Sequence, residues 1–574
     1  MTVKKITLYF NTLKHLRQRQ ISYRLWYFLR NRWRKRTGFK YNFEENSPLS
    51  KKLIFEPSIA APNSFSIENG FTFLNLNKKF DSVINWEYSD YGKLWTYNLT
   101  YFDFLNQNQE SALARHEATE GSNFSLILED FIEKLPQLKN ATEPFPIALR
   151  GINWIKYFVQ NNVQNAAYDR SLFQQYQILA DNIEYHLLGN HLLENGFSML
   201  FGAVYFQNND FWTLAHKILS EELEEQILDD GAHFELCPMY HKIMLFRTLD
   251  CYNLLKNNLF DVGFGMSDVG GDTLPTFNIP NSTSFPPSVF SAKYDNLKKL
   301  LAEKAALMLG WLENMTYTDG TTPHFGDSTD GIAPTSKALF EYAKRLSIKP
   351  LRHPLSSSGF RRLKNTHFDL LAKVGKIGPD YILGHAHADS LSFELRINET
   401  PFLVDMGIST YETNDRRLLE RATASHNTVE INNKNSSEVW SSFRVGNRAN
   451  SKILADTPTE LSAEHNGYKT FGVNHLRTFN LSENSLDIID QTRKNGPSKA
   501  HFHFPPTLSL RLDNGTIYFN GGKIEFLTRE KHNTFVEKIE LADYLLPPQY
   551  NTFATAQKVI VTFKNTLYTR ITHV

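Results

Sequence analysis

The sequence has few cysteines, no long apolar run and no acidic side chain before Glu44. With only Cys237 and Cys251 in 574 residues, we expect no disulfide framework. No run of about 20 apolar residues is present, and no apolar stretch of about 7–15 residues near the N-terminus has the pattern of a signal peptide. The formal net charge of +1 gives no argument for a nucleic-acid partner, and we predict none.

Lysine and arginine recur throughout the residues before Glu44, and apolar side chains interleave with them at roughly helical spacing. This pattern predicts a basic helix, which can dock on the rest of the chain with a solvated basic face. Alternatively, it can make peripheral contact with anionic lipid or with an acidic polymer. We assign residues 1–75 to this helix and a loop-rich lead-in.

The next part of the chain has mostly helical periodicity, with apolar residues three and four positions apart. The predicted helices are Ser125–Lys134, Ile147–Val163, Ser171–Leu188, Asn195–Phe206, Trp212–Leu228, Tyr240–Asn257 and Leu297–Leu312. Short polar loops join many of them, so neighbouring helices should be antiparallel. We therefore predict an incomplete α/α toroid over residues 76–350.

The pattern changes after a linker rich in proline and serine at residues 347–358. Beyond it, many short segments alternate apolar with polar residues, and Asn514-Gly515 and Gly521-Gly522 supply turn residues. This alternation predicts a C-terminal antiparallel β-sandwich over residues 356–574. The fold class is thus a multidomain protein with a helical half followed by a β half.

A segment rich in histidine opens the predicted sandwich. His385, His387 and Asp389 are two positions apart, so in an extended strand they would face one cleft. Asp405 and His426 follow on neighbouring predicted strands. Two histidines and an aspartate can hold a divalent metal, although surface strands also carry such residues without binding anything.

Two loops in the helical half also concentrate polar residues. The first contains Asn190 at a helix boundary, and the second leads into a helix that carries Tyr240 just after Pro238. The positive end of a helix dipole there favours a phenolate. Alternatively, Tyr240 is a core tyrosine with a satisfied hydroxyl and Asn190 is a helix cap.

Taken together, these motifs resemble the heparinase II/III family of polysaccharide lyases, close to heparinase III and related to alginate lyases. The resemblance lies in Gly-Asn-His at 189–191, Phe-Glu-Leu-Cys-Pro-Met-Tyr-His at 234–241, His-Ala-His-Ala-Asp-Ser at 385–390 and Ser-His-Asn-Thr-Val at 425–429. It implies an α/α toroid followed by a β-sandwich. It also implies β-elimination on a uronic-acid-containing polysaccharide. Cys237 stands where the family more often has serine.

The resemblance assigns roles to individual residues. Asn190 would neutralise the uronate carboxylate, Tyr240 would act as acid and base, and His385 would be the partner histidine. His387, Asp405 and His426 match the family's metal positions, which implies a structural zinc, manganese or calcium ion. Further residues are expected to bind substrate: Arg150, Asn153, His191, Glu194, Glu235, His241, Arg421 and Asn427. For the catalytic groups we expect separations of about 5–10 Å across a bound sugar.

Two other functions stay open at this point. A glycoside hydrolase on an α/α toroid needs two carboxylates beside the scissile bond, for which Glu194, Glu235 and Asp327 are available. A non-catalytic glycan-binding protein of a polysaccharide biosynthesis system would use the same cleft without turnover. The family implies a periplasmic or cell-envelope location, whereas the missing signal-peptide pattern leaves the cytoplasm open as well.

Overall fold

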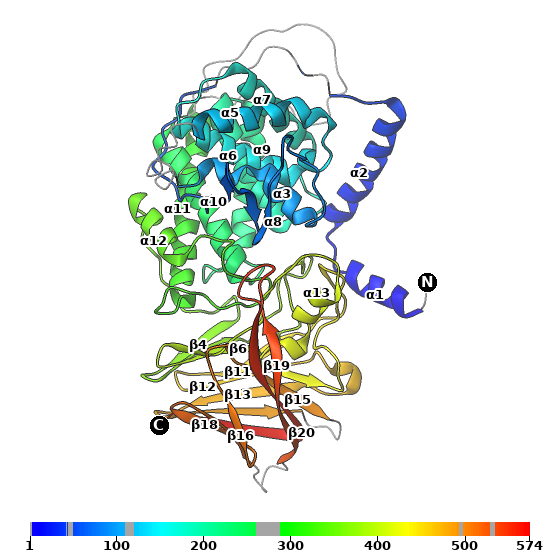
Figure 1. Cartoon of the computed structure of the whole chain (residues 1–574), viewed down its shortest axis with the longest axis vertical. Coiled ribbons are helices and arrows are strands. Elements are labelled where there is room, and N and C mark those ends of the chain that lie inside the picture. The colour runs from blue at the N-terminus through cyan, green and yellow to red at the C-terminus, as the bar shows by residue number, and fades with distance from the viewer. Residues whose placement is uncertain are drawn as a thin grey trace.

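The chain folds into a helical half and a β half that stack along the long axis of the molecule (Figure 1). The computed structural model describes residues 3–41, 43, 50–108, 120–259, 287–492, 497–527 and 534–573. Within these ranges no helix has the length and apolar character needed to cross a membrane.

The helical half is an incomplete α/α toroid, as predicted. Its helices are α3 (Lys93–Tyr101), α5 (Glu120–Lys134), α6 (Pro144–Gln160), α7 (Ala166–Asp181), α8 (Gly189–Phe206), α9 (Asn209–Gln226), α10 (Pro238–Asn257), α11 (Pro287–Met315) and α12 (Ser336–Arg345). Their apolar faces meet in one core that buries Trp95, Trp154 and Trp212 almost completely. The predicted helix Ser171–Leu188 ends early, at Asp181, and the following residues form the loop into α8.

The β half consists of two antiparallel sheets with a shared core. The smaller sheet has the order β4-β5-β6-β7: Phe360–Lys364, Phe368–Lys373, Phe393–Ile397 and Thr400–Leu403. The larger one contains β8 (Val429–Ile431), β11 (Ser451–Asp456), β12 (Glu460–His465), β13 (His475–Leu481), β14 (Ser485–Gln491), β15 (Ser498–His503), β16 (Arg511–Asp513), β17 (Thr516–Phe519), β18 (Gly522–Leu527), β19 (Thr534–Leu546) and β20 (Ala554–His573). The predicted fold class is confirmed.

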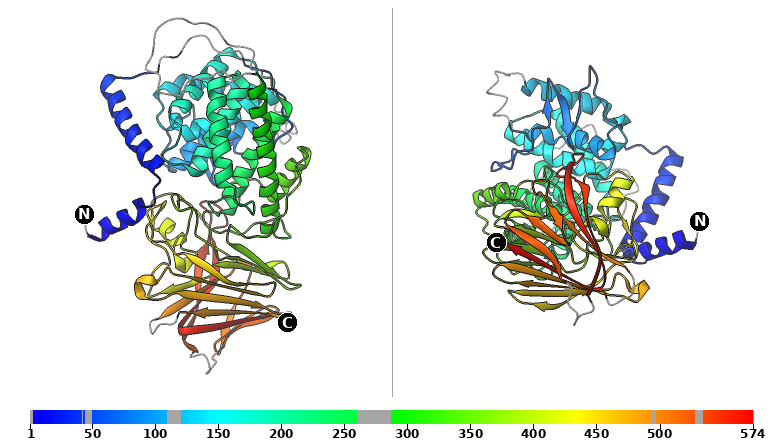
Figure 2. Two further views of the ribbon diagram at one scale, coloured as in Figure 1. Left: turned by 180° about the vertical axis from the view of Figure 1, so that it is seen from behind. Right: turned by 60° about the horizontal axis from the view of Figure 1, so that its bottom comes forward.

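Shorter elements fill the connections. They are strands β1 (Phe65–Ser66), β2 (Gly70–Phe73) and β3 (Leu76–Lys78), the hairpin β9 (Val439–Trp440) and β10 (Arg444–Val445), and helix α13 (Asp415–Glu420). The 3-10 turns are Asp103–Asn106, Leu135–Gln137, Asn140–Thr142, Thr423–Ser425 and Lys469–Phe471. Two N-terminal helices, α1 (Val3–Leu13) and α2 (Gln18–Thr37), lie along one flank of the molecule (Figures 1 and 2).

Asp230 fastens the linker between the halves to the toroid. Its Oδ2 accepts hydrogen bonds from the amides of Ser356 and Ser358 at 2.9 and 3.0 Å, and from the Ser358 hydroxyl at 2.6 Å. Burial raises the pKa of Asp230, but these donors outweigh burial and hold it below the usual value. The carboxylate therefore ties the loop after α9 to the entry of β4.

We expect Asp230→Asn to lower the free energy of unfolding by about 1–3 kcal/mol at neutral pH, because buried donors lose a charged acceptor. Because the pKa of Asp230 is lower in the folded state, its charge adds stability that is present above the unfolded-state pKa of about 3.9. That stability is lost as the pH falls through the folded-state pKa. Denaturant unfolding of wild type and variant between pH 7 and pH 2 checks this. A constant difference across that range would contradict the role of the charge.

Candidate functional site

The first turns of two toroid helices present the candidate catalytic residues. Asn190 follows Gly189 at the start of α8, where the positive φ of 60° brings the backbone close to Glu235. Its side chain does not cap the helix. Instead, Nδ2 donates to Glu235 Oε2 at 3.1 Å and contacts His385 Nε2 at 3.1 Å. Tyr240 lies in the first turn of α10, which begins at Pro238.

His385 reaches this pair from the other half of the molecule. Its ring stacks on the Tyr240 ring with centroids 3.8 Å apart. Asn190, Tyr240 and His385, which are up to 195 positions apart, thus form one contact cluster at the junction of the halves. Asn190 Nδ2 and His385 Nε2 are closer together than the expected 5–10 Å.

The histidine segment is a loop that precedes strand β6, which begins at Phe393. His385 Nδ1 and His387 Nε2 both contact the Asp327 carboxylate at 2.8 Å. Asp389 points elsewhere and accepts from Lys373 Nζ at 2.7 Å. The prediction that all three side chains face one cleft is therefore wrong for Asp389.

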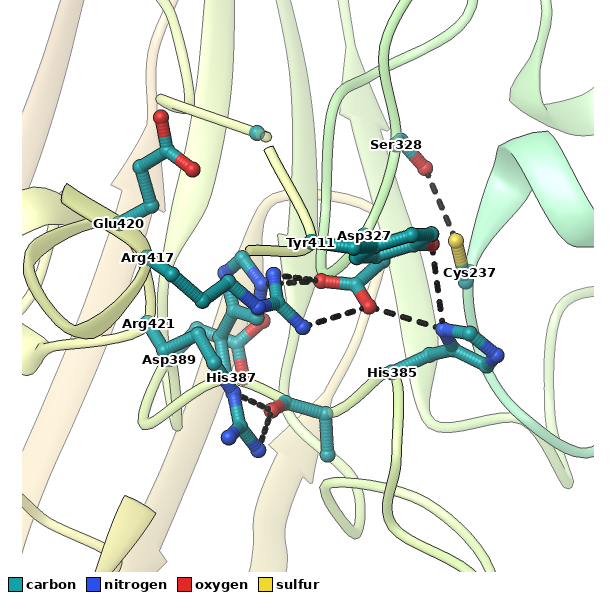
Figure 3. A network of polar contacts seen from close by, with 12 residues as sticks. Cys237, Asp327, Ser328, His385, His387, Asp389, Tyr411, Arg417, Glu420 and Arg421 are labelled. Carbon is teal, nitrogen blue, oxygen red and sulfur yellow. Dashed lines mark hydrogen bonds and ion pairs between the residues drawn. The ribbon is translucent and has the colours of Figure 1, made fainter. Parts of the chain in front are cut away.

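Asp327 is the centre of a buried charged network (Figure 3). Arg417 of α13 donates through both terminal nitrogens to its two carboxylate oxygens, and the side chains of both residues are 0% exposed. Burial alone would raise the pKa of Asp327, but Arg417 and the two histidines hold it well below the usual value. Because the ionised Asp327 can only accept, its contact with His385 Nδ1 fits the tautomer that carries a proton there and turns Nε2 toward Asn190.

Tyr240 is protonated in the substrate-free protein. Burial, followed by the neighbouring Tyr550, raises the pKa of Tyr240 well above its usual value. The hydroxyls of Tyr240 and Tyr411 lie 3.0 Å apart, and this contact only partly opposes the shift. The expectation that the helix dipole makes Tyr240 a phenolate is wrong, because loss of solvent dominates.

Cys237 and Ser328 support the start of α10. The Ser328 hydroxyl accepts from the Met239 amide at 3.2 Å and lies 3.2 Å from Cys237 Sγ. Burial raises the pKa of the Cys237 thiol to about 12, so it stays protonated. Cysteine at this position therefore packs beneath the helix that presents Tyr240.

Among the predicted substrate-binding residues, Glu235 and His191 lie beside the cluster. Glu235 accepts from the Asn190 amide and side chain and lies 3.5 Å from His385 Nε2. His191 is 35% exposed and contacts Glu184 at 3.1 Å. Burial lowers the pKa of His191, but Glu184 outweighs burial and the net shift is upward.

The other predicted substrate-binding residues are buried and bound by protein groups. Glu194 lies 3.3 Å from Arg247. Five more donate to backbone carbonyls: Arg150, Asn153, His241, Arg421 and Asn427. Arg150, for example, is 0% exposed, and its guanidinium donates to the backbone carbonyls of Thr100 and Ala141. These contacts position loops and helices, and substrate binding by these six residues stays a prediction.

The predicted metal residues lie near one another, with the rings of His387 and His426 5.2 Å apart, but their side chains are not arranged as a set of three ligands. His426 Nδ1 lies 3.0 Å from both Asp405 oxygens, but His387 turns its Nε2 toward Asp327. In the described ranges no group of three or more histidine, cysteine, aspartate or glutamate side chains is arranged to hold a metal ion. The buried nitrogens His387 Nδ1 and His426 Nε2 have no hydrogen-bond partner in the described part of the chain, and the zinc, manganese or calcium ion stays a prediction.

Sequence reasoning missed Arg417 and Tyr411 as members of the site. Arg417 occupies a short helix, and no local pattern distinguishes it from neighbouring Arg416. Tyr411 is one of 25 tyrosines, and its contacts with Tyr240 and His385 depend on the docking of the two halves. Asp327 was noted only as a candidate hydrolase acid, a role that its burial against Arg417 opposes.

Two family models match the chain. Heparinase II/III N-terminus matches residues 11–268, and Heparinase II/III-like, C-terminal, matches residues 348–573. A heparin-sulfate lyase from Bacteroides stercoris is 26% identical over 349 residues, covering 56% of this chain and 46% of that protein. Another heparin-sulfate lyase, from Pedobacter heparinus, is 24% identical over 48% of this chain and 41% of that protein. The chain thus matches less than half the length of these relatives.

Solved structures share the fold. A crystal structure of heparinase III aligns with a TM-score of 0.63 and 16% identity, covering 95% of this chain and 89% of that one. A heparan sulfate lyase from Pedobacter heparinus aligns with a TM-score of 0.52 and 18% identity, covering 86% and 79%. At these identities the likeness concerns the arrangement of toroid and sandwich.

Proposed function

The chain belongs to the heparinase II/III family, and from this premise we propose that it is a polysaccharide lyase. Its substrate would be a uronic-acid-containing polysaccharide, cleaved by β-elimination. The heparin-sulfate lyases among its relatives support this reading. The observation that carries the proposal is the contact cluster of Asn190, Tyr240 and His385, held by the ionised Asp327.

The reaction requires three groups in the roles that these residues can fill. Abstraction of the C5 proton places charge on the uronate carboxylate, and the Asn190 amide stabilises that enolate-like state. His385 Nε2 takes the proton, since Asp327 holds and orients the ring through Nδ1. Tyr240, protonated at the start, donates its proton to the leaving O4.

The electron flow is balanced without a further reactant. The C5–H bonding pair becomes the C4–C5 double bond, the C4–O4 bond breaks, and O4 leaves as a hydroxyl with the Tyr240 proton. The products are an unsaturated uronate and a new reducing end. Proton transfer from the imidazolium of His385 to the phenolate of Tyr240 then restores the site, and the Tyr411 hydroxyl, 3.0 Å from the Tyr240 hydroxyl and 3.4 Å from His385 Nδ1, links the two groups.

Substrate binding and base activation are coupled in this scheme. Asn190 Nδ2 donates one hydrogen to Glu235 Oε2 and directs the other toward His385 Nε2. A uronate carboxylate that accepts the second hydrogen frees the Nε2 lone pair for the C5 proton. The same event replaces an internal contact of Asn190 with a charge-assisted one.

The geometry favours elimination over the hydrolase alternative. A hydrolase needs one carboxyl group to donate a proton and another to act as base or nucleophile. Asp327 is bound on both oxygens by Arg417, and Glu194 is buried beside Arg247. Neither carboxyl group is available to a glycosidic oxygen.

Incubation with a panel of uronic-acid polymers tests the proposal. The panel should include heparan sulfate, unsulfated glycosaminoglycans, alginate and bacterial exopolysaccharides. We expect ultraviolet absorbance from an unsaturated uronate to rise with at least one of them. Reducing ends that form without this absorbance would show hydrolysis and overturn the elimination mechanism.

We expect Asn190→Ala to lower kcat by about 10²-fold or more, as for loss of an oxyanion donor. Asn195→Ala on the same helix is a matched control, because Asn195 is buried and bonds the Glu184 carboxylate and backbone instead. Steady-state kinetics on the polymer identified in the panel provides the readout. Equal losses in both variants would mean that only packing of α8 had been disturbed.

A further inference from the structure

The N-terminal helices α1 and α2 each have one bound face and one free face. On α2 the inner face carries Gln20, Tyr27, Arg30 and Arg34, whose side chains bond to toroid residues 181–187. Arg17 and Arg19 add ion pairs with Glu225 and Glu221. The predicted docking of the basic helix on the rest of the chain is therefore present, and it uses the acidic groups on that side.

The opposite face of α2 is apolar and basic. Ile21, Leu25, Phe28, Leu29 and Trp33 are each between 52% and 60% exposed, although they are large hydrophobic side chains. Arg32 and Arg36 lie on the same face at helical spacing, and neither has an ion-pair partner in the described part of the chain. We call this surface the outer face of α2.

Helix α1 repeats the arrangement. Its inner side packs on the β9–β10 hairpin, where Tyr9 meets Trp440 edge-on at 5.1 Å and Thr12 accepts a hydrogen bond from the Trp440 indole. The other side exposes Ile6, Phe10 and Leu13 in a stripe of spacing four and three. Both helices thus leave apolar stripes outside the packed body, on the flank seen in Figure 2.

We propose that the outer faces of α1 and α2 bind the surface of an anionic lipid bilayer. Apolar side chains can enter the boundary between headgroups and acyl chains, while Arg32 and Arg36 contact anionic headgroups. A second copy of the chain fits poorly, because a symmetric contact would place these cations against their own counterparts and no acidic residue precedes Glu44. A soluble polyanion would match the charge but would leave the apolar stripes in water.

Vesicle flotation tests the proposal with the full chain. We expect binding to phosphatidylcholine vesicles that contain phosphatidylglycerol to exceed binding to pure phosphatidylcholine by about tenfold or more, and to weaken with added salt. Binding does not depend on the proposed lyase activity, so Tyr240→Phe should float like wild type.

Matched pairs of variants separate this surface from general effects. Leu25→Asp/Leu29→Asp should reduce vesicle binding at least about tenfold, whereas Leu126→Asp, at a 63% exposed leucine of α5, should not change it. Arg32→Glu/Arg36→Glu should reduce vesicle binding as Leu25→Asp/Leu29→Asp does. Lys337→Glu/Lys344→Glu on α12, which changes the net charge equally, should bind as wild type.

Three outcomes would overturn the proposal. Wild type could stay unbound to anionic vesicles, or the two outer-face variants could bind as well as wild type. Finally, the wild type could fail to bind vesicles and instead self-associate or bind dextran sulfate in sedimentation velocity, and the outer-face variants could abolish that interaction. The outer-face positions lack inner contacts, so circular dichroism should show an intact fold in each variant.

Discussion

Tyr240→Phe is expected to lower kcat by about 10³-fold or more on any polymer that the wild-type enzyme cleaves. The substitution removes only one hydroxyl group, which is the proton donor for O4 in the proposed reaction. Phenylalanine keeps the ring that stacks on His385 at 3.8 Å, so the cluster should persist. KM should change little, because the lost interaction belongs to the transition state.

Tyr176→Phe provides the matched control. Tyr176 is fully buried in the toroid, and its hydroxyl contacts only Ser198 at 3.4 Å. This variant should keep kcat within about twofold while losing about 1 kcal/mol of stability. Near-wild-type activity of Tyr240→Phe would falsify the assignment of Tyr240 as the acid.

Asp327→Asn is expected to damage both activity and stability. The free energy of unfolding should fall by about 3–5 kcal/mol, because Arg417 stays buried without its counter-charge. kcat should fall by about 10²–10⁴-fold, since an amide no longer fixes the tautomer of His385. Thermal unfolding and steady-state kinetics on the same preparations measure the two effects.

The sandwich contains a matched control for the loss of a buried charge. Asp490 accepts from Arg477 and from His475 Nε2, and all three side chains are 0% exposed. Asp490→Asn should therefore cost similar stability while kcat changes little. A comparable fall in kcat would show that Asp327 matters to the fold alone.

A second variant separates positioning from stability at Asp327 itself. Asp327→Asn/Arg417→Met removes the unpaired cation and should recover part of the lost stability. It should not restore kcat, because His385 still lacks its carboxylate. Recovery of both together would contradict the positioning role.

The periodicity of the sequence predicted the two-part fold because it is a local property. Helical spacing between Ser125 and about Leu346, and alternation after the linker, each depend on residues a few positions apart. Helix ends were less well predicted, as at Asp181, where the chain turns toward α8 although apolar residues continue. The motifs around Asn190, Tyr240 and His385 were visible for the same local reason.

The sequence does not show which of the predicted substrate-binding residues are buried. Arg150 and Arg421 are charged, yet each is completely buried and donates to backbone carbonyls. A charged residue near a motif can therefore support the site without touching the substrate. Its role depends on which chain segments pack around it.

The sequence by itself determined the helical and β halves, and it placed three candidate catalytic residues on segments that could meet. The tertiary structure decided how they meet. Only the docking of the halves puts Asp327 against both His385 and Arg417, which sets the orientation of the histidine. Burial in that junction raises the pKa of Tyr240, because a local helix dipole is weaker than the loss of solvent around a phenolate.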